Sequence, residues 1–88
     1  MNYFTLKFQV KDFGTFKNVF DANERERKSH GISTVKAVKS IENPDTILVM
    51  LEAPSVNIIK ERINDPGLHK KWEEAGMIGK PEVNIYED

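Results

Sequence analysis

Cysteine is absent from this chain of 88 residues. Without it the chain can form neither a disulfide framework nor a thiolate metal site, which also excludes a metal chaperone that works through thiols. A chain this short buries only a modest fraction of its surface and is marginally stable alone. We therefore expect a single domain over residues 1–88, stabilised by association with a second copy of itself.

An excess of one charge is also lacking. Charged residues make up 31% of the chain, yet the formal net charge is −1. This balance argues against a nucleic-acid partner held by bulk electrostatics and against a polybasic membrane surface. No apolar run approaches the roughly 20 residues of a spanning helix, and the N-terminus has no signal-peptide pattern. We expect no nucleic-acid partner, no membrane partner and a cytoplasmic location.

Motifs for common chemistries are missing as well. There is no serine motif for a nucleophilic triad, and the glycines Gly76 and Gly79 follow a predicted helix instead of opening one, so no phosphate loop is present. The two histidines, His30 and His69, lie far apart and lack the local spacing of a metal or haem site. RNA-recognition modules carry stacking aromatics on their central strands, and residues 46–53 have none. We expect no metal and no cofactor.

What is present is a clear pattern of strands. Residues 2–10 alternate, with Phe4, Leu6, Phe8 and Val10 on one face, as in a strand with one apolar side. Residues 32–41 predict a second strand, with Val35 and Ala37 sharing a face. The tight loop 42–45 joins it to a third strand at 46–53, whose apolar run suits a central strand covered on both faces. A last strand is predicted at 82–86.

Three helices complete the pattern. Asp12 is a suitable N-cap for a helix that runs to about His30 and stops at Gly31. Ser55 caps a second helix, in which Val56, Ile59 and Ile63 are predicted to be buried and Lys60, Glu61 and Arg62 exposed. After a break at 64–66, Asp65 caps a third helix with the apolar stripe Leu68, Trp72 and Ala75, ended by Gly76.

The order strand, helix, strand, strand, helix, strand predicts an α+β, ferredoxin-like βαββαβ fold. Its four-stranded antiparallel sheet would carry helices on one face and leave a partly apolar face open. Two copies placed sheet to sheet would cover that face, so we expect a homodimer.

Several short motifs are spread over nearly the whole chain. They are Phe16, Phe20-Asp21, Arg27, Gly31, Asn43-Pro44-Asp45, Asp65-Pro66-Gly67-Leu68, Ala75-Gly76-Met77, Gly79 and Pro81. In these motifs the chain resembles the dimeric α/β-barrel superfamily, and in particular its small, uncharacterised antibiotic-biosynthesis-monooxygenase-like proteins. The resemblance implies a dimeric barrel. Members include cofactor-free monooxygenases, haem-handling enzymes, isomerases and proteins without known activity, so the resemblance implies that an enzyme here would be a cofactor-independent monooxygenase-like or isomerase-like one.

Two groups of residues are candidates for ligand binding. Asn23, Arg27 and His30 continue the apolar arc of the first helix, where they either overhang the sheet in solvent or line one end of a pocket. His69 and Trp72 are i,i+3 neighbours, and Trp72 is either core or the flat wall of a site for an apolar or aromatic ligand. A non-catalytic ligand-binding or regulatory module, and a purely structural dimer, remain alternatives.

Overall fold

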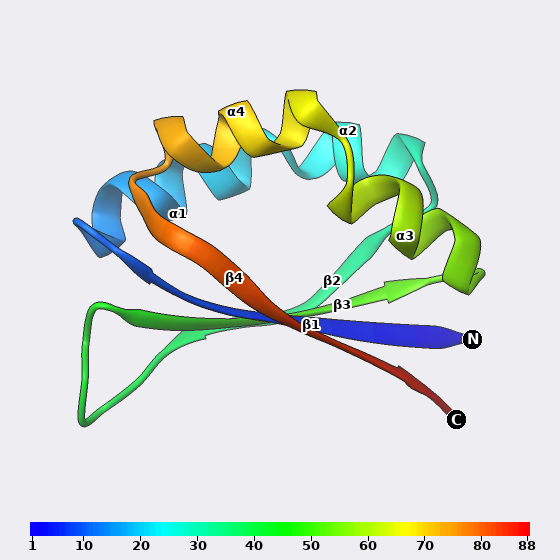
Figure 1. The fold of residues 1–88 in the computed structure, drawn as a ribbon, viewed down its shortest axis with the longest axis horizontal. Coiled ribbons are helices and arrows are strands. Elements are labelled where there is room, and N and C mark those ends of the chain that lie inside the picture. Colours follow the sequence, from blue (N-terminus) through cyan, green and yellow to red (C-terminus); the bar gives the residue numbers. More distant parts are fainter.

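A computed structural model describes all 88 residues as four strands and four helices (Figure 1). The strands form one antiparallel sheet in the order β2-β3-β1-β4, and the helices all lie on one face of it. The predicted α+β, ferredoxin-like fold is confirmed, and the sheet-to-sheet dimer stays a prediction. The elements are β1 Asn2–Val10, α1 Phe13–Ala22, α2 Glu24–Ser29, β2 Ser33–Lys39, β3 Thr46–Ala53, α3 Val56–Ile63, α4 Pro66–Glu74 and β4 Met77–Glu87.

The core lies between the helices and the two central strands. Alternate residues of β1 and β3 point toward the helices, and burying each large apolar side chain among them contributes about 1.5–3 kcal/mol. The buried residues of the two strands are Phe4, Leu6, Phe8 and Val10 in β1 and Ile47, Val49, Leu51 and Ala53 in β3. The prediction for β1 is confirmed in full.

The predicted helix caps are present. Asp12 accepts a hydrogen bond of 2.8 Å from the amide of Thr15, and Ser55 and Asp65 cap α3 and α4 in the same way. Gly76, with φ +85°, follows α4 as predicted, since a residue there must adopt a left-handed backbone. The local sequence therefore determines where these helices begin and where α4 ends.

The first helix differs from the prediction because it is broken in two. The backbone of Asn23 departs from helical geometry, with φ −96° and ψ 5°. Its side-chain amide donates a hydrogen bond of 2.9 Å to the carbonyl of Val19. Asparagine side chains compete in this way for backbone carbonyls, which shortens helices. The break separates α1 from α2, so the expectation of one helix from Asp12 to His30 is wrong.

Two strands also differ from expectation. A bulge between Thr34 and Lys36 shifts the register of β2, so Val35 leaves the face of Ala37 and is 48% exposed. β4 begins at Met77, earlier than the predicted residue 82. In β3, Leu48 is 41% exposed in the single chain. The second face of this strand is expected to be covered by a second copy, so cover on both faces stays a prediction.

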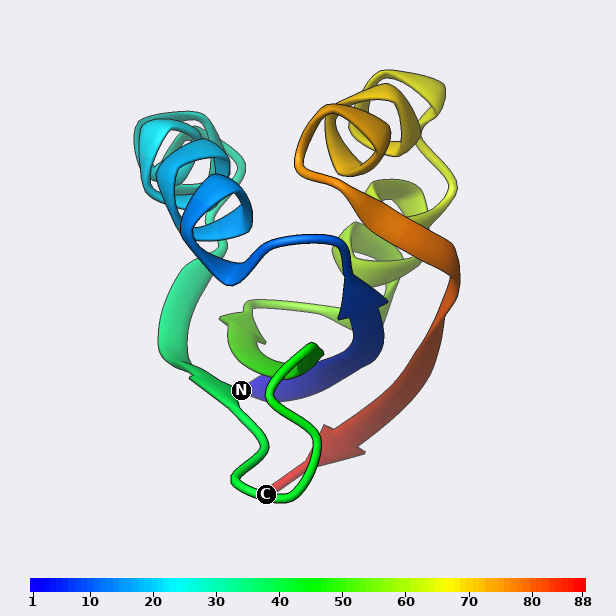
Figure 2. The same ribbon diagram turned by 90° about the vertical axis from the view of Figure 1, so that its left-hand side faces the viewer.

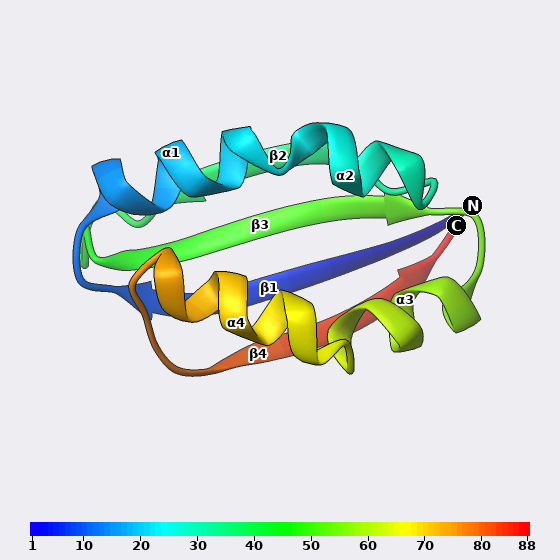
Figure 3. The same ribbon diagram turned by 90° about the horizontal axis from the view of Figure 1, so that it is seen from above.

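The four helices form two pairs with a space between their ribbons (Figures 2 and 3). The α1–α2 pair lies over the β2 side of the sheet, and the α3–α4 pair lies over the β1–β4 side. None of these helices is long and apolar enough to cross a membrane.

Candidate functional site

A partly open cavity of about 60 Å³ lies between the helix pairs and the sheet. Side chains of 17 residues line it, and 13 of these are hydrophobic, including Phe4 and Phe16. The other four are Asn23, Arg27, Arg62 and Lys71. The walls therefore combine a large apolar surface with three cationic side chains and no acidic one.

Arg27 is a buried arginine on α2, with 6% of its surface exposed. Its guanidinium carbon lies 3.7 Å from the ring centroid of Phe20, and its Nη1 donates a hydrogen bond of 2.8 Å to the carbonyl of Phe20. Its Nε is buried without an acceptor. Burial, and then the nearby charge of Arg62, lower the pKa of Arg27, while Glu24 and Asp21 act in the opposite direction.

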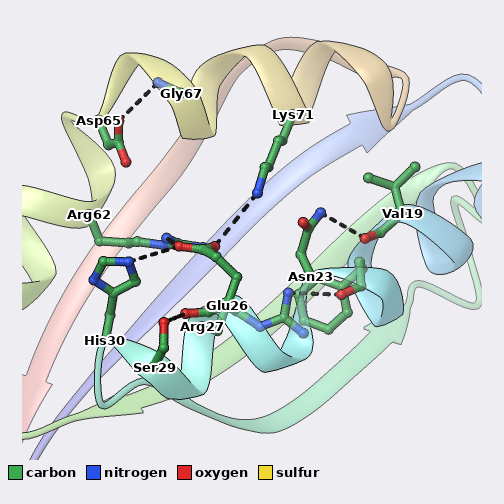
Figure 4. Close-up of polar contacts among 11 residues, drawn as sticks. Val19, Asn23, Glu26, Arg27, Ser29, His30, Arg62, Asp65, Gly67 and Lys71 are labelled. Atoms are coloured by element: carbon green, nitrogen blue, oxygen red, sulfur yellow. Dashed lines mark hydrogen bonds and ion pairs between the residues drawn. The ribbon is translucent and has the colours of Figure 1, made fainter.

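Glu26 connects the two helix pairs (Figure 4). Arg62 donates to its two carboxylate oxygens at 2.6 and 2.7 Å, in the bidentate geometry that makes such pairs strong. His30 Nε2 lies 2.9 Å and Lys71 Nζ 3.9 Å from the same carboxylate. The hydrogen bonds from Arg62, followed by the charges of Arg62, Lys71 and His30, hold the pKa of Glu26 below its usual 4.5 against the opposing effect of burial.

The structure brings three of the five predicted site residues to one cavity: Asn23, Arg27 and Trp72. Of the two alternatives for Arg27, the solvated one is wrong, because the residue is 6% exposed. His30 does not line this cavity, and its side chain is 57% exposed beside Glu26. A ligand-binding role for these residues stays a prediction.

His69 faces a different part of the surface. Its ring stacks on Trp72 at a centroid distance of 5.0 Å, and its Nε2 lies 2.7 Å from the carbonyl of Ile63. It lines a shallow surface depression against β4, to which Trp72 also contributes. Trp72 thus lies between the cavity and this depression.

Sequence reasoning missed two cationic residues of the cavity. Arg62, predicted to be exposed, is 8% exposed, so that prediction is wrong. The signal was available: Arg62 lies three positions after the buried Ile59, and Lys71 lies three positions after Leu68, so helical periodicity places both cations on the apolar stripes. No group of three or more His, Asp and Glu side chains is placed to hold a metal ion.

Comparison of the fold finds several similar solved structures. A protein from Bordetella bronchiseptica aligns with TM-score 0.80 and 13% identity, over 99% of this chain and 95% of that one. One from Caulobacter crescentus aligns with TM-score 0.73 and 16% identity, over 99% and 88%. Both carry the name "putative antibiotic biosynthesis monooxygenase". This chain therefore shares its fold with these two proteins.

The same fold also occurs in a conserved protein from Methanosarcina mazei, which aligns with TM-score 0.74 and 18% identity over 99% of this chain and 91% of that one. No protein-family model matches the sequence, and the search of curated proteins found no match. At these identities the likeness extends to the fold, and function has to be argued from the site.

Proposed function

We propose that this chain is a small-molecule-binding protein, which holds a compact and mostly apolar ligand in the cavity between its helix pairs and its sheet. The observation that carries the proposal is the composition of the cavity wall, in which 13 of 17 residues are hydrophobic and Asn23, Arg27, Arg62 and Lys71 supply polar groups. A large apolar wall with a few polar groups that fix orientation is typical of ligand sites.

The size of the cavity limits the ligand. A cavity of about 150 Å³ is known to accommodate benzene, whereas this one measures about 60 Å³. A polycyclic molecule therefore does not fit while the helix pairs stay in place. The ligand is either small or extends through the open side of the cavity.

The proposal includes a homodimer formed through the open sheet face. Leu48 and Val38 are neighbours across β3 and β2, each about 40% exposed, and Tyr3 pairs with Tyr86 across β1 and β4. An exposed apolar surface of this kind on a sheet is a common interaction surface. A second copy of the same face would cover it.

Oxidation of the bound ligand is the second candidate function, favoured by the names of the structural neighbours. The cavity wall has no carboxylate, imidazole or hydroxyl group to move a proton. Asn23 and Lys71 would be the groups left to orient and polarise a substrate. Because this set is small, binding is the function that the wall supports better, and oxygen consumption in the presence of an identified ligand would separate the two.

The binding proposal can be tested by native mass spectrometry of the purified protein. We expect a small molecule to be retained, and its addition to the stripped protein to change the fluorescence of Trp72, the single tryptophan. The proposal fails if nothing is retained and a fragment screen by nuclear magnetic resonance shifts no residue of the cavity wall.

A further inference from the structure

Arg27 is a buried cation without a counter-ion. No carboxylate lies within 4.0 Å of its guanidinium. Arg62, the other buried charged residue, has a carboxylate within that distance. Arginine is rarely buried this completely unless it is paired, because removal of a charge from water is costly. The ring and carbonyl of Phe20 offset part of that cost.

The guanidinium also has unused donors. Of its five N–H groups, one donates to the carbonyl of Phe20, the buried Nε has no acceptor, and Nη2 makes no hydrogen bond. Nε and Nη2 form one edge of the planar group, the edge that matches the two oxygens of a carboxylate. The side chain is part of the cavity wall and therefore has two unused donors on one edge. An oxyanion that binds both donors has to displace the atoms that now enclose Nε.

The nearby acid does not fill this role. Glu26 is bound by Arg62 through both of its oxygens and by His30, and it is not part of the cavity wall. The charged side chains of the wall are Arg27, Arg62 and Lys71, all cationic. Glu26 pairs with Arg62 and Lys71 from beside the cavity, so Arg27 is the wall cation that is left for an anionic group that enters it.

We infer that the ligand of this cavity is an organic acid, with a carboxylate or similar oxyanion on a compact apolar body, and that Arg27 is the residue that binds the acid. This inference rests on the proposed function and specifies its ligand class. The phenylalanines of the wall hold the apolar body, and the oxyanion supplies the counter-ion that Arg27 lacks. Neutral apolar molecules of the same shape bind more weakly, because they leave the guanidinium unpaired.

The test compares small acids with their neutral amides: acetate with acetamide, and propionate with propionamide. Titrations are followed by nuclear magnetic resonance, so that shifts of Phe20, Asn23 and Trp72 locate binding in the cavity. The wild-type protein should bind each acid about tenfold or more tightly than its amide, the range expected for charge-assisted hydrogen bonds. Arg27→Met should remove this preference. Arg25→Met, which changes an exposed arginine of the same helix, should retain it.

The outcomes separate the inference from the proposed function. Equal binding of acid and amide in the cavity, or an acid preference that survives in Arg27→Met, would overturn the inference while binding itself stands. If neither acids nor amides shift the cavity residues, both proposals fail. Should Arg27→Met not fold, Arg27→Lys keeps the charge but loses the bidentate edge, and it should reduce the acid preference. The comparison of acid and amide binding to the wild-type protein tests the preference for an acid without any variant.

Discussion

Arg62 of α3 donates two hydrogen bonds, of 2.6 and 2.7 Å, to the carboxylate of Glu26 on α2. The other polar contact between the two helix pairs, from Lys71, also ends on Glu26. One carboxylate thus connects both halves of the helical layer beside the cavity. Its removal would leave the nearly buried guanidinium of Arg62 without its partner.

Substitution of Glu26 by glutamine should therefore destabilise the protein. We expect the free energy of unfolding to fall by about 1–3 kcal/mol, because a buried cation loses its charge-assisted hydrogen bonds. Denaturant unfolding measures the change. Glu24→Gln is the matched control, since the exposed Glu24–Lys28 pair at 3.8 Å contributes less than about 0.5 kcal/mol. Equal effects of the two substitutions would contradict the assigned role of Glu26.

The stabilisation by Glu26 should also depend on pH. Because its pKa is lower in the folded protein than its usual 4.5, the carboxylate stabilises the fold fully above that value and progressively less as the pH falls toward its folded pKa. The difference in unfolding free energy between wild type and Glu26→Gln should then be largest near neutrality and shrink below about pH 4.5. A constant difference throughout the acid range would show that the charge of Glu26 is not what stabilises the contact.

A decrease in the volume of the cavity should weaken ligand binding. Val19 lines it from α1, and Val19→Leu adds one methylene to a space of about 60 Å³. We expect affinity for a small cavity ligand such as propionate to fall about tenfold or more, with a stability change within about 1.5 kcal/mol. Val56→Leu is the control, a half-buried helical valine away from the cavity. Comparable affinities of the two variants would place the ligand elsewhere.

The proposed dimer can be tested on the open sheet face. Leu48→Glu puts a charge at the centre of that face, where it would have to be buried between two copies, so we expect the dimer to dissociate. Sedimentation equilibrium across micromolar concentrations measures this. Ala22→Glu adds the same charge at an exposed residue of α1, on the helix-covered side of the sheet, and should leave the assembly intact. A wild-type protein that sediments as a monomer would refute the dimer itself.

The sequence predicted the elements well where local physics decides them. The alternation of β1 and the caps Asp12, Ser55 and Asp65 depend on neighbouring residues, and all of them were found as expected. The site was predicted in part by the same reasoning. Asn23 and Arg27 were singled out because the apolar arc of the first helix changes to polar residues where burial was expected.

The errors arise where distant residues decide. Helical periodicity alone places Arg62 on the apolar stripe, but its partner Glu26 lies 36 positions earlier in the sequence, and no local pattern contains that partner. The bulge at Val35 depends on pairing with β3. The helix break at Asn23 has a local cause, the hydrogen bond of its side chain. Asparagine also occurs inside helices, so the hydrophobic periodicity favoured a continuous helix.

The position of β1 in the sheet has a consequence for synthesis on the ribosome. This strand lies between β3 and β4, and Asn2 pairs with Glu87. The strand that is translated first therefore cannot complete its hydrogen bonds until the strand translated last has emerged. Such long-range pairing slows folding. During that delay the unpaired backbone edge of β1 toward β4 is a site where nascent chains can pair with each other and a chaperone can bind.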